Sequence, residues 1–216
     1  MLKEKSLREI EVLIERYPVL GPMRNELISA VERMVLCVEK GRKILICGNG
    51  GSAADSLHIV GELMKSFVLK RKLPPVWQDK LREQYPDLAE YYIQNLQGAI
   101  PAISLVNEVS LMTAYSNDNA ADLMFAQQVL GYGQVGDVLL AISTSGNSGN
   151  VLHAARIANA IGMEVISMTG ANGGKLKELS DVLLAAPSTI THQIQEYHLP
   201  IYHAICLALE AHFFGE

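Results

Sequence analysis

The sequence predicts an α/β fold: a three-layer sandwich in which a five-stranded parallel sheet is covered by helices on both faces. Five short apolar runs alternate along the chain with segments of helical spacing. Each run is apolar at nearly every position, which is typical of strands buried on both faces of a parallel sheet. The length of 216 residues and the hydrophobic fraction of 49% fit one domain over residues 1–216 with a sizeable core.

The N-terminal segment 1–41 is predicted to be helical. Apolar spacing indicates helices over about 7–16 and about 22–40, and Gly41 has the position of a residue that ends the second one. These helices precede the sheet and need a partner surface, and the last helix of the chain has little polar face beyond Glu210 and His212. We therefore expect a homotetramer.

The five strands are expected in a regular series. Their ranges are 44–47, 100–105, 138–142, 164–168 and 182–186. Helices are expected from Ala53, over about 108–115 and 120–130, up to about Ile161, and as a short turn carrying Leu176 and Leu179. The last element, 192–213, reads as a long helix broken or bent at Pro200, because proline lacks the N–H that a helix interior requires.

The segment 69–98 interrupts this alternation and is interpreted as an insertion. It is rich in charged and aromatic residues, and Pro74 and Pro75 stop regular structure near its start. A helix interrupted near Pro86 is expected over 77–95. The basic run Lys70-Arg71-Lys72 is interpreted as a solvated turn.

Composition excludes several classes of function. A net charge of −5 argues against general binding to nucleic-acid phosphates. The three cysteines, Cys37, Cys47 and Cys206, lie in apolar runs, so we expect free core thiols in a reducing compartment. The charged start has no apolar core of a signal peptide, and no apolar stretch reaches membrane-spanning length. We expect a cytoplasmic protein with no membrane or nucleic-acid partner.

The first glycine-rich loop follows the first strand. Gly48-Asn49-Gly50-Gly51 breaks regular structure, and Ser52 is expected to be the N-cap of the next helix. Free N–H groups and the dipole at such a helix start favour an anion. The match to the dinucleotide fingerprint is weak because no acidic residue follows about twenty positions later, and no Walker lysine is present.

The second loop, 143–150, follows the third strand. Its Ser143, Thr144, Ser145 and Ser148 place four hydroxyls beside a helix start. One such residue would indicate only a turn or an N-cap. Four in six positions, close to another anion-binding loop, favour a phosphate monoester on a small metabolite. Both loops follow carboxyl ends of strands, so they can converge on one crevice of the sheet.

Two helices carry candidate catalytic or metal-binding side chains. His58 and Glu62 are four residues apart and share one face of the helix after the first loop. A single His and a nearby Glu are more often structural, but the last helix begins near the same sheet edge and also offers polar groups. These are His192, Gln195, Glu196, His198 and His203. Helical phase pairs His203 with Glu196 or His192, and periodicity does not choose the ligand set.

The whole set of motifs resembles a known family. The motifs are 47–52, Asp55, His58-x-x-x-Glu62, Asn117-Asp118, 136–148, 169–170 with 173–174, 194–196 and His203. Together they resemble the sugar isomerase (SIS) domain family and, within it, the phosphoheptose isomerases, over nearly the whole chain. Two segments depart from that family: 69–98 is longer than its usual link, and Ile190-Thr191-His192-Gln193 stands where an Asp-Thr-Ala-Arg run is expected.

The resemblance implies a flavodoxin-like sheet and a homotetramer whose sites lie between subunits. It implies a phosphorylated sugar as substrate and one Zn²⁺ per subunit, with Glu62 and His203 placed for proton transfer. The implied zinc ligands are His58, Glu62, Gln195 and His203, so the resemblance selects Gln195 over Glu196. The implied substrate contacts are Asn49, Gly50, Gly51, Ser52, Asp55, Glu62, Asn117, Asp118, Ser143, Thr144, Ser145, Ser148 and Gln195.

The resemblance implies aldose–ketose isomerisation through an enediol, from sedoheptulose 7-phosphate to D-glycero-D-manno-heptose 7-phosphate. Two alternatives belong to other classes. SIS domains also act as non-catalytic sugar-phosphate sensors in regulators, and an SIS-type initiation factor binds the replication initiator. That relative lacks the group formed here by His58, Glu62 and His203, which favours an enzyme.

Overall fold

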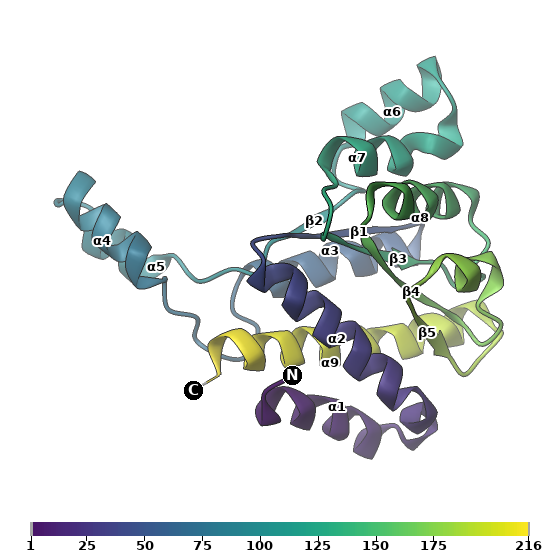
Figure 1. Cartoon of the computed structure of the whole chain (residues 1–216), viewed down its shortest axis with the longest axis horizontal. Coiled ribbons are helices and arrows are strands. Elements are labelled where there is room, and N and C mark those ends of the chain that lie inside the picture. Colours follow the sequence, from purple (N-terminus) through teal and green to yellow (C-terminus); the bar gives the residue numbers. More distant parts are fainter. Residues whose placement is uncertain (1, 216) are drawn as a thin grey trace.

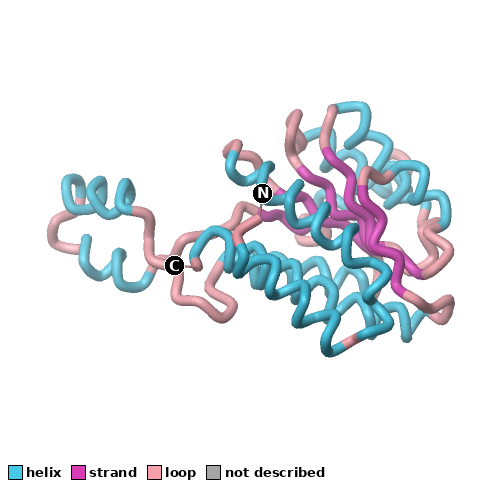
Figure 2. Tube along the Cα trace, turned by 60° about the horizontal axis from the view of Figure 1, so that its bottom comes forward, coloured by secondary structure: helices cyan, strands magenta, loops and turns pink. Residues whose placement is uncertain are grey.

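The centre of the fold is a parallel sheet of five strands in the order β2-β1-β3-β4-β5. The computed structural model describes residues 2–215, and its sheet is covered by helices on both faces (Figures 1 and 2). This order is the one expected of a flavodoxin-like sheet. The strands are β1 (Ile44–Gly48), β2 (Ala102–Ser104), β3 (Val138–Ile142), β4 (Glu164–Gly170) and β5 (Val182–Ala186).

The helices of the described chain begin and end close to the predicted ranges. The α-helices are α1 (Glu4–Arg16), α2 (Arg24–Glu39), α3 (Gly51–Met64), α4 (Pro75–Gln84), α5 (Ala89–Asn95), α6 (Val109–Asp118), α7 (Met124–Tyr132), α8 (Gly149–Ile161) and α9 (Thr191–Phe214). Short 3₁₀ turns are η1 (Pro18–Met23), η2 (Ala121–Leu123) and η3 (Gly174–Leu179).

Alternate residues of the strands pack into two separate cores. Ile44 and Ile46 belong to the core that α1, α2, α3 and α9 cover, whereas Leu45 and Cys47 belong to the core under α7 and α8. This alternation follows from the two-residue period of a strand. It confirms that the apolar runs are strands buried on both faces.

The order of the strands reverses at β1, which pairs with β2 on one side and β3 on the other. Gly48 at the end of β1 is paired with Ile142 at the end of β3. The two polar loops therefore leave the sheet side by side at its carboxyl edge. In open parallel sheets this switch point is where ligands bind.

Two predicted boundaries are wrong for physical reasons. Strand β2 is shorter than 100–105, and the N–H of Ile100 bonds instead to the carbonyl of Leu63. The predicted helix over 120–130 begins as the 3₁₀ turn η2. Of the break or bend expected at Pro200, the break is absent, because α9 is one continuous helix. Proline removes one helical hydrogen bond, and the packing of α9 compensates for that loss.

The N-terminal helices already have a partner surface within the chain. Helix α1 lies along α9, and residues of both are buried in one core with α2 (Figure 1). Gly41 has φ +69° and ends α2 in the left-handed conformation, as predicted. Because α1 and α9 cover each other, the N-terminal helices do not by themselves require a partner subunit.

The segment 69–98 contains two helices that project from the body of the molecule (Figures 1 and 2). Within the projecting helices only Ala89 is buried, and Trp77, Tyr85 and Tyr91 are exposed. The base of this segment departs from the prediction. Arg71 is not in a solvated turn, because only 1% of it is exposed.

The three cysteines are free and buried, as predicted. Burial raises the pKa of the Cys37 thiol to about 11 and that of Cys47 to about 12, so both are protonated near neutral pH. Among residues 2–215, no helix has both the length and the apolar character needed to cross a membrane.

Candidate active site

The first loop turns sharply from β1 into α3. Gly50 has φ +55° and is the N-cap residue, so the prediction that Ser52 caps the helix is wrong. Ser52 lies inside the first turn and is buried. A Cβ on Gly48 would lie 2.7 Å from Cβ of Ser52, which explains why glycine is required there.

Gln195 of α9 lies against this loop. A Cβ added to Gly51 would come within 2.4 Å of Nε2 of Gln195, so the amide occupies the space that glycine leaves. Glu196 is exposed and lines a separate hollow with Tyr17 and Gln193. The structure therefore brings Gln195, and not Glu196, to the first loop.

The second loop presents its hydroxyls at the start of α8. Ser143 and Ser148 share a hydrogen bond of 3.0 Å between their hydroxyls. Ser148 is the N-cap residue of α8, but its hydroxyl makes no capping bond and contacts Ser143 instead. Thr144 is half-buried and Ser145 is exposed, and the Ser145 hydroxyl accepts a bond from the N–H of Asn147.

Two contacts hold these loops together. Asn49 and Asn150 exchange two amide hydrogen bonds of 2.8 and 2.9 Å, which join the first loop to the start of α8. A third loop supports the second one, since a Cβ on Gly146 would lie 2.0 Å from the carbonyl oxygen of Gly173. The convergence that the strand order predicts is confirmed, because the starts of α3 and α8 lie side by side at the carboxyl edge of the sheet.

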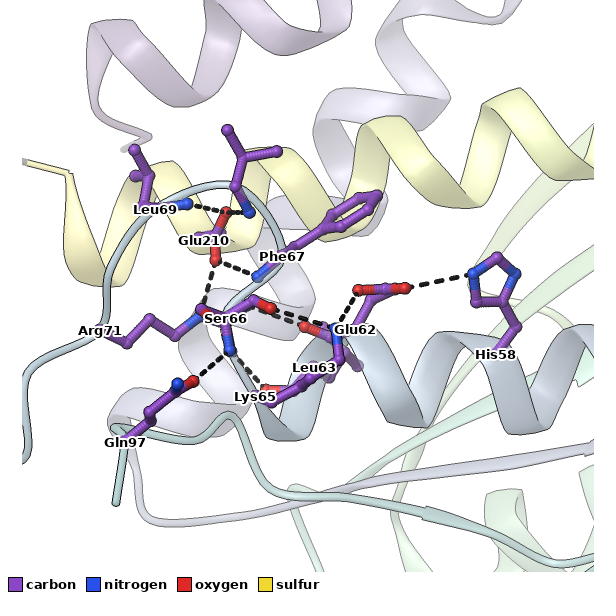
Figure 3. A network of polar contacts seen from close by, with 11 residues as sticks. His58, Glu62, Leu63, Lys65, Ser66, Phe67, Leu69, Arg71, Gln97 and Glu210 are labelled. Carbon is purple, nitrogen blue, oxygen red and sulfur yellow. Dashed lines mark hydrogen bonds and ion pairs between the residues drawn. The ribbon is translucent and has the colours of Figure 1, made fainter. Parts of the chain in front are cut away.

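His58, Glu62 and His203 meet between α3 and α9. Nε2 of His58 lies 3.2 Å from Oε1 of Glu62, and Nζ of Lys65 lies 3.0 Å from the other carboxylate oxygen (Figure 3). The imidazole rings of His58 and His203 have centroids 5.1 Å apart and stand edge to face. The two helices thus bring together groups that are 145 residues apart in the sequence.

The environment of this cluster differs from one side chain to the next. The side chain of His58 is 44% exposed, whereas that of Glu62 is 12% exposed. Nε2 of His203 is buried and has no hydrogen-bond partner among the described residues. Burial, followed by the nearby His58, lowers the pKa of His203 below its ordinary value. The cluster is therefore open to solvent at His58, whereas at His203 it contains a buried nitrogen without a hydrogen-bond partner in the described chain.

Tyr202 and Asp55 complete the cluster, and the sequence did not identify Tyr202. The Tyr202 hydroxyl lies 2.9 Å from Nδ1 of His58. Burial raises the pKa of Asp55, although the Tyr202 hydroxyl and the nearby His58 oppose this rise. Oδ2 of Asp55 is buried without a partner in the described chain. Tyrosine in an apolar helix reads as core, so no local signal marks it.

A second polar cluster joins the same two helices nearer the end of α9 (Figure 3). The carboxylate of Glu210 accepts bonds of 2.8 to 3.0 Å from the N–H groups of Phe67, Val68 and Leu69 and from Nε of Arg71. Arg71 also donates to the carbonyls of Leu63 and Glu62 at 2.6 and 2.8 Å. Glu210 inside an apolar helix is the signal that predicts such a partner.

Other predicted residues lie elsewhere in the chain. Asn117 and Asp118 are exposed at the end of α6, bonded to each other at 2.9 Å, among helices on the other face of the sheet from α9 (Figure 1). His198 is fully buried and bonded to the carbonyl of Thr169 at 3.2 Å, so it is structural. His192 is exposed at the start of α9.

The predicted zinc ligands His58, Glu62, Gln195 and His203 are chemically suited to a metal ion, although their donor atoms do not form a ready metal site. Two imidazoles, a carboxylate and an amide oxygen are acceptable Zn²⁺ donors. The unpartnered Nε2 of His203 is consistent with a missing ligand. Nowhere in residues 2–215 do three His, Cys, Asp or Glu side chains already form a metal-binding group.

Comparisons with known proteins agree with this geometry. The model of the SIS domain family matches residues 88–170. The chain is 39% identical to the phosphoheptose isomerase of Shewanella oneidensis over 95% of this chain and 91% of the relative. The solved phosphoheptose isomerase of Neisseria gonorrhoeae superposes with a TM-score of 0.71 at 33% identity, covering 95% of this chain and 93% of that chain.

A more distant structure shares only the fold. It is the Vibrio vulnificus NanR protein, solved in complex with ManNAc-6P. The TM-score is 0.52 at 16% identity, and the superposition covers 94% of this chain and 60% of that chain.

Proposed function

The chain belongs to the phosphoheptose isomerase family of SIS-domain proteins, and we propose that it converts sedoheptulose 7-phosphate to D-glycero-D-manno-heptose 7-phosphate. The observation that carries this proposal is the meeting of His58, Glu62 and His203 between α3 and α9, where α3 is the helix that begins at the first glycine-rich loop. A sugar phosphate has both parts that such a site requires. Its phosphate suits the hydroxyls of the second loop, and its carbonyl end suits the acid–base groups.

The phosphate would be held by Ser143, Thr144, Ser145 and Ser148. Their hydroxyls and the N–H groups at the start of α8 supply neutral donors, which bind a phosphate without a fixed cation. The Asn49–Asn150 contact fixes the distance between this end and the first loop, where nothing lies within 4 Å of a Cβ built on Gly50, so the backbone there is open to the sugar.

Isomerisation moves a proton between the two carbons at the carbonyl end. One group removes the proton next to the carbonyl, an enediol forms, and an acid returns a proton to the neighbouring carbon. Glu62 and His203 are the candidates, because they reach one space from α3 and α9. His58 contacts both Glu62 and the ring of His203, so it helps to orient the pair.

The proposal includes a Zn²⁺ ion held by His58, Glu62, Gln195 and His203. When bound, it would polarise the carbonyl and hydroxyl oxygens and stabilise the negative charge of the enediolate. A carboxylate that binds metal is a poorer base, so Glu62 would either exchange roles or leave proton transfer to His203. The Lys65 ammonium at 3.0 Å is a second cation that competes for the Glu62 carboxylate.

We also propose a homotetramer in the cytoplasm with sites between subunits. The position of Asn117 and Asp118 supports shared sites, because a neighbouring copy could supply them where this chain does not. Three buried free thiols fit a reducing compartment. Light scattering tests the assembly, and a mass equal to one subunit would refute it.

The test of function is a panel of ketose and aldose phosphates, assayed with and without added Zn²⁺. We expect turnover of sedoheptulose 7-phosphate that rises with Zn²⁺ and that falls after treatment with a chelator. A sugar-phosphate sensor is the second candidate, favoured by the fold shared with the NanR protein. Binding of the sugar phosphate without turnover under any metal condition would favour the sensor.

A further inference from the structure

The chain between α3 and α4 begins with an irregular segment, residues 65–71, which we call the strap. The strap leaves the end of α3 and lies against α9 (Figure 3). At one end, Nζ of Lys65 lies 3.0 Å from the carboxylate of Glu62. At the other end, Arg71 donates to the backbone carbonyl of the same residue at 2.8 Å. Both ends of the strap therefore contact Glu62, one of the two proposed proton-transfer residues.

The middle of the strap contacts the second proton-transfer residue, His203. The ring of Phe67 lies against its imidazole, with centroids 5.5 Å apart and ring planes inclined at 55°. The rings of Tyr202 and His58 also contact this imidazole, with centroids 4.9 and 5.1 Å away. Nε2 of His203 has no hydrogen-bond partner among residues 2–215. Ring packing, and not a hydrogen bond at Nε2, therefore holds the orientation of the imidazole.

The backbone of the strap is itself fixed by a buried carboxylate. The N–H of Phe67 donates to Oε1 of Glu210 at 2.8 Å, and two further N–H groups of the strap donate to the other oxygen. Only 1% of Glu210 is exposed, so water does not compete for these bonds. The ring of Phe67 is half-buried and reaches toward α9 (Figure 3). Its position is thus determined by the strap and by the core against which it packs.

We propose that Phe67 is a positioning residue, which holds the imidazole of His203 in the orientation that places it against His58. This inference rests on the proposed function, because it gives Phe67 a part in proton transfer by His203. Phe67 has no acidic or basic group and acts only through that imidazole. Glu210 acts one step further away, since it fixes the backbone that carries the ring. The strap thereby links the end of α3 to the histidine on α9.

Phe67→Leu tests this role by steady-state kinetics with sedoheptulose 7-phosphate. Loss of the ring should lower kcat by about 10- to 100-fold, because a displacement of about 1 Å at a reacting group has an effect of this size. KM should change by less than about threefold, because the phosphate loop is untouched. Phe67→Tyr keeps the aromatic ring and should keep kcat near that of the wild type. An unchanged kcat in Phe67→Leu, or a change in KM alone, would overturn the proposal.

Phe213→Leu is the matched control. Phe213 is also half-buried, packs against the same core and lies against a histidine, His212, with centroids 5.1 Å apart. His212 is not among the proposed site residues. Both variants lose a ring from one core, so their melting temperatures should fall by similar amounts, whereas only Phe67→Leu should lose kcat. An equal loss of kcat in both variants would show that general packing is responsible, and would overturn the proposal.

Crystal structures of the two variants and of the wild type, after treatment with a chelator, show the orientation directly. We expect His203 to stay against His58 in the wild type and in Phe213→Leu, and to adopt a changed rotamer or two rotamers in Phe67→Leu. A single unchanged rotamer in Phe67→Leu would overturn the inference, whatever the activity of the wild type. If the wild type turns over no sugar phosphate, the proposed function fails, and these structures still decide whether Phe67 holds His203.

Discussion

Two polar clusters join α3 to α9, and they differ in how completely their polar atoms are partnered. Around Glu210, both carboxylate oxygens and all three nitrogens of the Arg71 guanidinium have hydrogen-bond partners. Around His58, the structure leaves Oδ2 of Asp55 and Nε2 of His203 buried and unpartnered within residues 2–215. We infer that the cluster around Glu210 stabilises the fold and that the cluster around His58 binds a ligand.

The energetics of burial explain this difference. A buried ion pair holds a fold only when its remaining hydrogen-bonding capacity is satisfied, as it is for Arg71 and Glu210. An unpartnered buried polar atom costs free energy, about 1–3 kcal/mol, and a ligand that supplies the missing partner recovers it. The cluster around Glu210 fixes α3 and α9 against each other. The cluster around His58 depends on that fixed spacing.

The largest effect is expected in the cluster around His58. Glu62→Gln keeps the shape of the side chain but removes its basicity, so kcat should fall by about 10²- to 10⁴-fold. Steady-state kinetics with sedoheptulose 7-phosphate measure this change. Glu196→Gln on the exposed side of α9 is the control and should keep wild-type kcat. Near-normal turnover by Glu62→Gln would remove Glu62 from the mechanism.

Substitutions in the cluster around Glu210 should lower the stability of the fold. Arg71→Met leaves the Glu210 carboxylate buried without its cation, which should cost about 3–5 kcal/mol of unfolding free energy. For a chain of this size the melting temperature should fall by roughly 6–20 °C, measured by calorimetry. Lys70→Met, at the exposed neighbouring position, should leave the melting temperature unchanged. Equal melting temperatures for both variants would show that the pair does not hold the fold.

His203→Met distinguishes a catalytic role from a structural role for the cluster around His58. The thioether fills a similar volume and removes the buried unpartnered Nε2, so stability should stay equal or rise by about 1 kcal/mol. Activity should be lost in the same protein. Thermal unfolding and kinetics on one sample check both statements. A loss of stability like that of Arg71→Met would show that His203 is structural.

The smallest effect is a pH dependence of stability from Glu210. Burial alone would raise the pKa of Glu210, but bonds from the N–H groups of Phe67, Leu69 and Val68 and from Arg71 lower it below the ordinary value of 4.5. Its lowered pKa in the folded state means that the carboxylate stabilises the protein above about pH 4.5, and that this stability is lost as pH falls through the folded pKa.

Comparison of Glu210→Gln with the wild type measures this contribution. The difference in melting temperature should be constant near pH 6–8 and should shrink below about pH 4.5. A difference that grows toward acid pH would contradict the assigned direction.

The sequence predicted the fold well because its signals are local. Apolar runs of five residues and glycine turns marked the strands, and the final order β2-β1-β3-β4-β5 agrees with the implied flavodoxin-like sheet. The errors came from tertiary context. The N-cap moved from Ser52 to Gly50, because Gly50 can adopt φ +55°. Helix α9 passes through Pro200, and the packing of the chain makes up for the lost bond.

The site was less predictable, because it depends on how two distant helices are rotated. The spacing of His58 and Glu62 was sufficient to place them on one face, but phase could not choose between Gln195 and Glu196. That choice depends on the packing of α9 against Gly51. Tyr202 and Arg71 carried no local signal: one read as core, and the other as a solvated turn. Both are explained only by partners far away in the sequence, His58 and Glu210.

The most direct measurement is a crystal structure of Glu62→Gln with sedoheptulose 7-phosphate bound. The account predicts that the phosphate accepts hydrogen bonds from Ser143 and Ser148, and that the carbonyl end of the sugar lies beside residue 62 and His203. A sugar bound with its carbonyl end away from both α3 and α9, in this subunit and in any partner subunit, would contradict the assignment of the unsatisfied cluster to catalysis.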